Sequence, residues 1–288
     1  MFLSGKKKIL SELQAQKEDQ VKREPYVAGY FYPDRKEILI ETIESFIPEV
    51  KEKIKALGVV SPHAGYEYSG PVAAAVYSAV IIPETVVILA PAHHQINSLF
   101  ALYDSGSWLT PLGQVPIEER LSELLVGETQ LITRDREAHR KEHSIEVQVP
   151  FLQYFQKNLS LVPILVSYQA NYESLAELGQ AISRAVINFD RPVLLVASTD
   201  MSHYVSQKMA EELDHKAISF IERLDPQGLF QVVISYGLSM CGFQPTAAML
   251  VAAKALGAKE GKLIKYQTSG DRTGDYREVV GYAGLAVI

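Results

Sequence analysis

Cysteine is almost absent from this 288-residue chain, which contains a single thiol, at Cys241. An intrachain disulfide is therefore impossible, which excludes a disulfide-stapled secreted domain and favours a reducing compartment such as the cytoplasm. Long apolar runs are also missing, because none approaches the roughly 20 residues that span a bilayer. The early lysines lead into no apolar segment of the kind that a signal peptide needs. We therefore expect a cytoplasmic protein without a membrane partner.

An excess of positive charge is absent too. The chain has 28 Lys and Arg residues against 34 Asp and Glu residues, a formal net charge of −6. A mildly acidic surface repels phosphate backbones, so nucleic acid is not an expected partner. Hydrophobic residues make up 47% of the chain, which argues against disorder and is ordinary for a globular protein.

Four short apolar runs indicate buried strands, at residues 59–60, 86–90, 161–166 and 193–197. They are continuously apolar rather than alternating, which is typical of strands buried on both faces of a sheet that helices cover. Helical patterns occur at residues 36–54, 69–80, 171–188, 207–223 and 244–256. The sequence therefore predicts one α/β domain over residues 25–288, with a central mixed or parallel sheet covered by helices. A polar helix or extension over residues 1–24 would precede it.

Histidines recur just past the ends of these runs. Only 7 occur in the chain, yet three of the four runs lead to His63, to His93 and His94, or to His203. Ligands of open α/β sheets bind beyond the carboxyl ends of the strands. An ordinary loop role is the simpler interpretation of any one histidine, but the recurrence favours one shared site. Because His93 and His94 are adjacent, one can face the site while the other braces it.

Two further residues could serve chemistry at the same edge. Asp200 lies three residues before His203, and a carboxylate near an imidazole can hold its tautomer and raise its basicity. A lone cysteine such as Cys241 is most often a buried small hydrophobe. It precedes a predicted helix, however, and a helix N-terminus would lower the thiol pKa and favour metal ligation or nucleophilic attack.

A separate pattern, His139-Arg140-Lys141-Glu142-His143, matches the H-x-x-E-H motif of inverted zinc peptidases. It would place His139 and His143 on one helical face. Five-residue patterns arise by chance, and no third ligand is identifiable, so a zinc hydrolase ranks last among the hypotheses. The alternatives are a charged, solvated helix start, or Glu142, His143 and Glu146 on the rim of the strand-end site.

Five of these motifs occur in the order seen in the Memo family. They are Pro62-His63-Ala64-Gly65-Tyr66, Pro91-Ala92-His93-His94, Glu142-His143-Ser144-Ile145-Glu146, Ser198-Thr199-Asp200-Met201-Ser202-His203 and Met240-Cys241-Gly242. Over residues 25–288 the chain resembles prokaryotic members of the kind called AmmeMemoRadiSam system protein B. The resemblance implies a fold like that of the class III extradiol ring-cleaving dioxygenases, which use non-haem iron(II).

By this resemblance, His63, His93 and Cys241 would hold a metal, His203 would be the acid/base group, and Asp200 would orient it. The pocket or second shell would comprise His94, Glu142, His143, Glu146, Tyr66 and Tyr204. The dioxygenases use two histidines and a carboxylate. A thiolate at Cys241 is softer than a carboxylate and also suits copper(I) or zinc.

We therefore expect a metal-dependent oxidoreductase with one iron(II), or copper, acting on a small aromatic, catecholic substrate. Zinc is the less favoured metal. The alternative is a non-catalytic module that binds a peptide or partner protein in the same pocket. The family name further suggests AMMECR1-type and radical-SAM proteins as partners.

Overall fold

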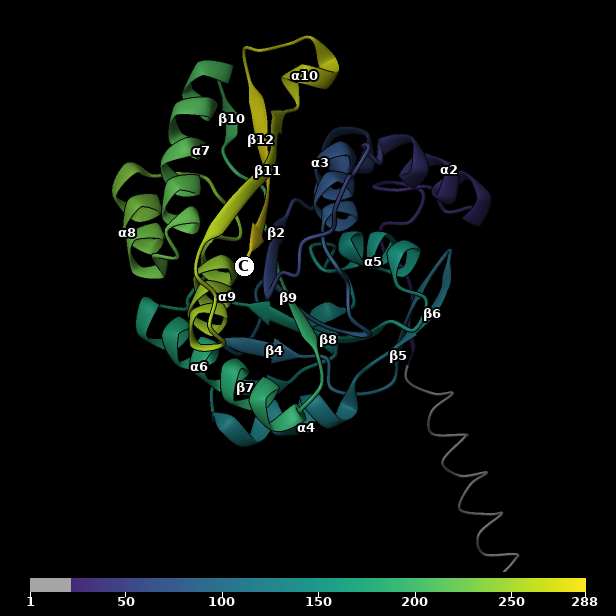
Figure 1. Ribbon diagram of the computed structural model, residues 1–288, viewed down its shortest axis with the longest axis vertical. Helices are drawn as coiled ribbons and strands as arrows, with labels where there is room; N and C mark the ends of the chain where they lie inside the picture. The colour runs from purple at the N-terminus through teal and green to yellow at the C-terminus, as the bar shows by residue number, and fades with distance from the viewer. Residues whose placement is uncertain (1–21) are drawn as a thin grey trace, which may run out of the picture.

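The computed structural model describes residues 22–288 (Figure 1). Most of the predicted N-terminal helix or extension therefore lies outside the described residues. Where that segment is described, Lys22–Arg23 forms a short strand, β1, which pairs in parallel with β5 (Ser107–Thr110). With β6 (Gly113–Pro116), these strands form a small three-stranded sheet beside the main one.

A mixed sheet runs through the centre of the molecule, with strand order β10-β12-β2-β9-β3-β8-β4-β7. Its four middle strands are parallel neighbours and include all four predicted runs: β2 (Gly58–Ser61), β9 (Val193–Ser198), β3 (Thr85–Pro91) and β8 (Ser160–Val166). They are buried along almost their whole length, as continuously apolar strands should be.

Shorter or antiparallel strands complete the sheet on both sides. β12 (Val279–Val287) runs antiparallel to β2, to β10 (His203–Val205) and to β11 (Gly261–Thr268). On the other side, β4 (Phe100–Leu102) is antiparallel to β8 and parallel to β7 (Ile132–Arg134). The predicted α/β fold with a central mixed sheet is confirmed.

Helices cover both faces of this sheet, as Figure 1 shows. One layer consists of α2 (Lys36–Phe46), α3 (Tyr66–Ala79) and α5 (Val149–Phe155), and the other of α4 (Glu119–Glu128), α6 (Tyr172–Phe189), α7 (Gln207–Glu222), α8 (Pro226–Tyr236) and α9 (Phe243–Ala255). Side-chain alternation along the strands supplies both cores. Val86 and Ile88 pack beneath the first layer, whereas Val87 and Leu89 pack beneath the second.

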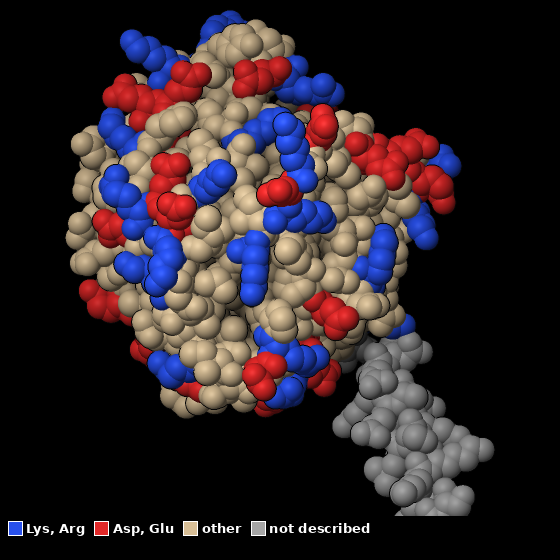
Figure 2. All heavy atoms as spheres, in the orientation of Figure 1, with Lys and Arg blue, Asp and Glu red and all other residues tan. Residues whose placement is uncertain are grey.

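All five predicted helices are present, but the first is shorter than expected. It ends at Phe46 rather than at residue 54. Pro48 disfavours helical geometry in the residue before it, and Ile47 is indeed extended, with φ −69° and ψ 117°. Among residues 22–288, no helix combines the length and apolar character that crossing a membrane requires. Acidic and basic side chains are interspersed over the face drawn in Figure 2.

Candidate metal centre

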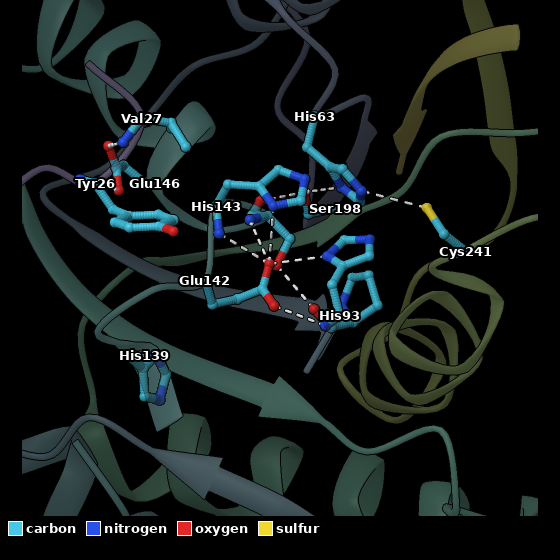
Figure 3. A network of polar contacts seen from close by, with 12 residues as sticks. Tyr26, Val27, His63, His93, His139, Glu142, His143, Glu146, Ser198 and Cys241 are labelled. Atoms are coloured by element: carbon cyan, nitrogen blue, oxygen red, sulfur yellow. Dashed lines mark hydrogen bonds and ion pairs between the residues drawn. The ribbon is translucent and has the colours of Figure 1, made fainter. Parts of the chain in front are cut away.

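Three imidazoles from separate segments meet at the carboxyl edge of the sheet (Figure 3). His63 follows β2, His93 follows β3, and His143 lies in the turn between two short 3-10 helices, η1 (Glu137–His139) and η2 (Glu146–Gln148). One ring nitrogen of each histidine lies within 4.8 Å of the others. Because β9 lies between β2 and β3, its carboxyl end, with Ser198 and Asp200, comes up between His63 and His93.

Hydrogen bonds determine the tautomer of the buried His63. The Ser198 hydroxyl donates its one hydrogen to the Ser144 carbonyl (2.6 Å) and accepts from Nε2 of Gln148 (2.8 Å). Nδ1 of His63, 2.8 Å from the same oxygen, must therefore be a donor. Burial, followed by the charges of His93 and His143, lowers the pKa of His63. The ring is thus neutral, and its Nε2 carries a free lone pair.

Glu142 determines the tautomer of His93 in the same way. Its Oε1 accepts from the backbone N–H groups of His143 and Ser144 (both 2.9 Å) and lies 2.8 Å from Nδ1 of His93. Its Oε2 accepts from the backbone N–H of His93 (2.7 Å). Burial acts to raise the pKa of Glu142, but the hydrogen bond and charge of His93 hold it well below its usual range. Burial acts to lower the pKa of His93, but the hydrogen bond and charge of Glu142 raise it. Once the ring is neutral, the carboxylate keeps the hydrogen on Nδ1, so Nε2 is the nitrogen with the lone pair.

The imidazole of His143 stacks on that of His93. The rings of His143 and His93 stack with centroids 4.5 Å apart and an angle of 22° between their planes. By contrast, His63 and His93 meet edge-on, at 80°. Burial lowers the pKa of His143 to about 4, so this ring is neutral at physiological pH.

Cys241 lies beside His63 but outside the group of three imidazoles whose ring nitrogens lie within 4.8 Å of one another. Its Sγ lies 3.3 Å from Nε2 of His63 and accepts a hydrogen bond from the backbone N–H of Asp200 (3.2 Å). The N-terminus of a helix was expected to lower the thiol pKa. Instead, burial first and the charge of Asp200 second raise it. The thiol is protonated, because desolvation outweighs the dipole of α9, whose N-cap is the next residue, Gly242.

A family model described as Memo-like protein matches residues 23–286. The chain belongs to the Memo family. It is 43% identical to the MEMO1 family protein MK0963 of Methanopyrus kandleri, over 92% of this chain and 98% of that protein. It is 40% identical to a MEMO1 family protein of Aquifex aeolicus, over 91% and 98% of the two chains.

A solved structure has a similar fold. It is the crystal structure of the uncharacterized protein JW3007 from Escherichia coli K12, with a TM-score of 0.52, 12% identity, and coverage of 80% of this chain and 99% of that one. At this identity the likeness concerns the fold alone. The curated Memo relatives cover almost the whole chain, so the family resemblance of the sequence motifs is confirmed.

The predicted acid/base pair is arranged differently from the expectation. Asp200 does not bind the ring of His203; its Oδ1 accepts from the backbone N–H of His63 (2.8 Å). Nδ1 of His203 lies 2.8 Å from the Ser239 carbonyl, which can only accept, so Nδ1 is the donor and Nε2 is free. Burial raises the pKa of Asp200 to about 6.

Three predicted pocket residues lie around the cluster rather than in it. Glu146 accepts from the backbone N–H groups of Tyr26 and Val27 and from the Tyr32 hydroxyl. The Tyr66 hydroxyl donates to the Val147 carbonyl (2.8 Å). His94 lines a separate cavity of about 360 Å³, together with residues of the 95–97 and 135–141 segments.

The inverted zinc peptidase motif does not form a site. Residues 140–145 are a turn, not a helix, so His139 and His143 share no helical face. His139 is fully buried, with Nε2 on the Ala101 carbonyl (3.0 Å) and its ring edge-on to Tyr103 and Trp108. Figure 3 shows it well apart from the other histidines.

Sequence reasoning missed Gln148 and Ser239 and did not single out Ser198 within its motif. Each acts on a histidine distant in sequence: Gln148 and Ser198 on His63, and Ser239 on His203. The only available signal was the position of Ser198 at the end of a buried strand, next to Asp200.

Proposed function

We propose that this Memo family protein is a metal-dependent oxidoreductase with one iron or copper held by Nε2 of His63, Nε2 of His93 and Sγ of Cys241. The observation that carries the proposal is the pair of fixed tautomers. Ser198 and Glu142 each take an Nδ1–H, which leaves both Nε2 lone pairs free. A carboxylate behind a metal-binding histidine is the usual outer-shell partner of such sites.

The separation of the His63 and Cys241 donor atoms fits a single ion. Metal–nitrogen bonds of about 2.0–2.1 Å and a metal–sulfur bond of about 2.3 Å at a tetrahedral angle place nitrogen and sulfur roughly 3.5 Å apart. Nε2 of His63 and Sγ of Cys241 are 3.3 Å apart. Cys241 is not one of the residues whose ligand atoms all lie within 4.8 Å of one another, so its Sγ must also move toward His93, besides losing the thiol proton, for the three donors to bind one ion.

Ring geometry favours Cys241 over His143 as the third ligand. The lone pair of an imidazole nitrogen lies in the plane of the ring. Because His93 and His143 are nearly parallel, their lone pairs run side by side rather than toward one point. His143 could ligate together with His93 only after one ring turned. In the present arrangement His143 is better placed to pack against His93 and against Phe31, whose ring centroid is 4.9 Å away.

The substrate that suits these groups is a small aromatic compound with adjacent hydroxyls. A bound iron or copper supplies Lewis acidity and access to dioxygen. In cleavage of a catechol ring, both atoms of dioxygen enter the product, so no further co-reactant is needed. Nε2 of His203 is available to take a hydroxyl proton, a contribution typically worth 10²–10⁴-fold in rate. The Ser239 carbonyl accepts the Nδ1–H of His203, which orients the ring and leaves Nε2 as the nitrogen that can accept a proton.

Metal reconstitution under anaerobic conditions tests the proposal. We expect one equivalent of iron(II) or copper per chain, lost in His63→Ala and His93→Ala and retained in the control His215→Ala, which changes an exposed histidine. Cys241→Ala should remove the thiolate-to-metal charge-transfer band, and His143→Gln should retain it. Absence of stoichiometric metal, or no effect of His63→Ala, would refute the metal site. Metal binding without turnover of any catechol would instead favour the peptide- or protein-binding alternative.

A further inference from the structure

Tyr204 has a backbone conformation that tyrosine rarely adopts. Its φ is +56°, in the left-handed region, and it shares a positive φ with only Asp190 and Leu224 among the non-glycine residues 22–288. It lies in β10 at an irregularity of the pairing with β12, between the pairs of His203 and Val205. Such bulges redirect side chains, and their left-handed position usually carries glycine. A bulky residue there costs free energy that the surrounding structure must offset.

Local structure accounts for the other two cases but not for Tyr204. Asp190 ends α6 in the left-handed conformation that helix C-termini favour. Leu224 follows α7 and buries its side chain in the core, with 3% exposed. Tyr204 is 76% exposed. Among residues 22–288, no hydrogen bond to the Tyr204 hydroxyl offsets the free-energy cost of its left-handed backbone.

The surroundings of Tyr204 connect it to the candidate site. Its ring lies beside that of His203, with centroids 6.0 Å apart and planes at 60°. Burial first, and then the charges of Asp200, Tyr68 and Tyr204, raise the pKa of the neighbouring Tyr282. These groups therefore lie near one another. Three tyrosines thus gather at the edge of the sheet that carries the acid/base histidine.

We propose that Tyr204 is a specificity residue whose ring, held out by the strained bulge, stacks on the planar ring of an aromatic substrate as it enters the metal site. The inference rests on the proposed function, because it concerns the substrate of that same site. An aromatic ring that is 76% exposed beside His203 can receive a planar ligand on its surface. Strain kept at such a position is typical of binding sites.

Two variants separate substrate binding from folding. Tyr204→Gly removes the ring and relieves the backbone strain, whereas Tyr204→Phe keeps the ring. As controls, Asp190→Gly changes another left-handed residue, at the C-terminal end of α6, and Tyr168→Ala removes another exposed tyrosine. The probe is 4-nitrocatechol, whose visible absorbance reports binding, titrated into the full chain with and without iron(II).

We expect Tyr204→Gly to unfold at the same or a higher temperature than the unchanged protein, yet to bind 4-nitrocatechol roughly three- to tenfold more weakly, the range for one aromatic pair. Tyr204→Phe should bind within twofold of the unchanged protein, as should both controls. The same ratio is expected without metal, because stacking does not depend on the ion.

Unchanged affinity in Tyr204→Gly, or a lower unfolding temperature, would overturn the inference, as would failure of 4-nitrocatechol to bind either form of the unchanged protein. Metal content, measured first on every variant, separates the two proposals. Failure to bind metal refutes the metal site alone, whereas normal metal content with unaltered nitrocatechol affinity in Tyr204→Gly refutes only the role of Tyr204.

Discussion

Arg23 is a buried cation that holds the turn carrying Glu142 and His143, and its removal should be strongly destabilising. Only 4% of the residue is exposed. Its guanidinium pairs with Glu146 (Nη1 to Oε2, 2.7 Å) and donates to the carbonyls of His139 (2.8 Å) and Glu142 (2.7 Å). It also lies over the ring of Trp108, 4.1 Å from the centroid.

The expected loss in the free energy of unfolding follows from the buried Glu146 carboxylate that Arg23→Met would leave unpaired. Removing one partner of a buried ion pair typically costs 3–5 kcal/mol, because the other charge stays buried without compensation. Glu146 would keep three neutral donors, Tyr26 N–H, Val27 N–H and the Tyr32 hydroxyl, which favours the lower end of that range. We therefore expect a loss of about 3 kcal/mol, a large part of the 5–15 kcal/mol that is usual for a folded protein.

Urea denaturation of the metal-free protein measures this loss. Arg140→Ala is the matched control, since Arg140 pairs with Glu137 on the same turn but both side chains are largely exposed, and its effect should stay within about 0.5 kcal/mol. Adding Glu146→Gln to Arg23→Met should recover part of the stability, because the unpaired charge is gone. A cost below about 1 kcal/mol for Arg23→Met, or no recovery in the double variant, would contradict the assigned role of the buried charge.

Three further predictions concern the metal centre. Glu142→Gln should weaken metal binding 10–100-fold in a chelator competition, the usual effect of losing an outer-shell carboxylate, whereas Glu137→Gln, on the exposed side of the turn, should not. Metal affinity should rise with pH across the neutral range, because the Cys241 thiol, whose pKa is raised by burial, must lose its proton before it can bind the metal. In Cys241→Ser the dependence of metal affinity on pH should flatten. A slope equal to that of the unchanged protein would argue against thiolate ligation. Burial raises the folded-state pKa of Asp200 to about 6. Between about pH 4 and 6 the folded protein therefore keeps a proton on Asp200 that the unfolded chain has lost, and the folded state loses stability as the pH rises through that window. Asp200→Asn should therefore stabilise the metal-free protein by up to about 3 kcal/mol at pH 7, with the gain vanishing near pH 4 in urea titrations; a gain independent of pH would show that ionisation is not its cause.

The middle of the fold was predictable because its strands are buried on both faces. Each of β2, β3, β8 and β9 is a continuous apolar run, and the chain offers few other places for such runs. The pairing of the outer strands of the sheet was not predictable. β12 pairs with three strands from distant parts of the chain, and β10 is only three residues long, so tertiary packing rather than local pattern decides their pairing.

The sequence by itself determined which residues reach the site edge: His63, His93 and His203 follow strands whose carboxyl ends must share one side of a parallel sheet. Only the tertiary structure decided what each can do. It turned His139 into the core and raised the thiol pKa of Cys241 by burial. It also selected the tautomers of the site histidines through partners far away in the sequence. The positions of the buried strands along the chain are encoded in local hydrophobicity, whereas tautomer, desolvation and ring orientation depend on atoms that only folding brings within hydrogen-bonding distance.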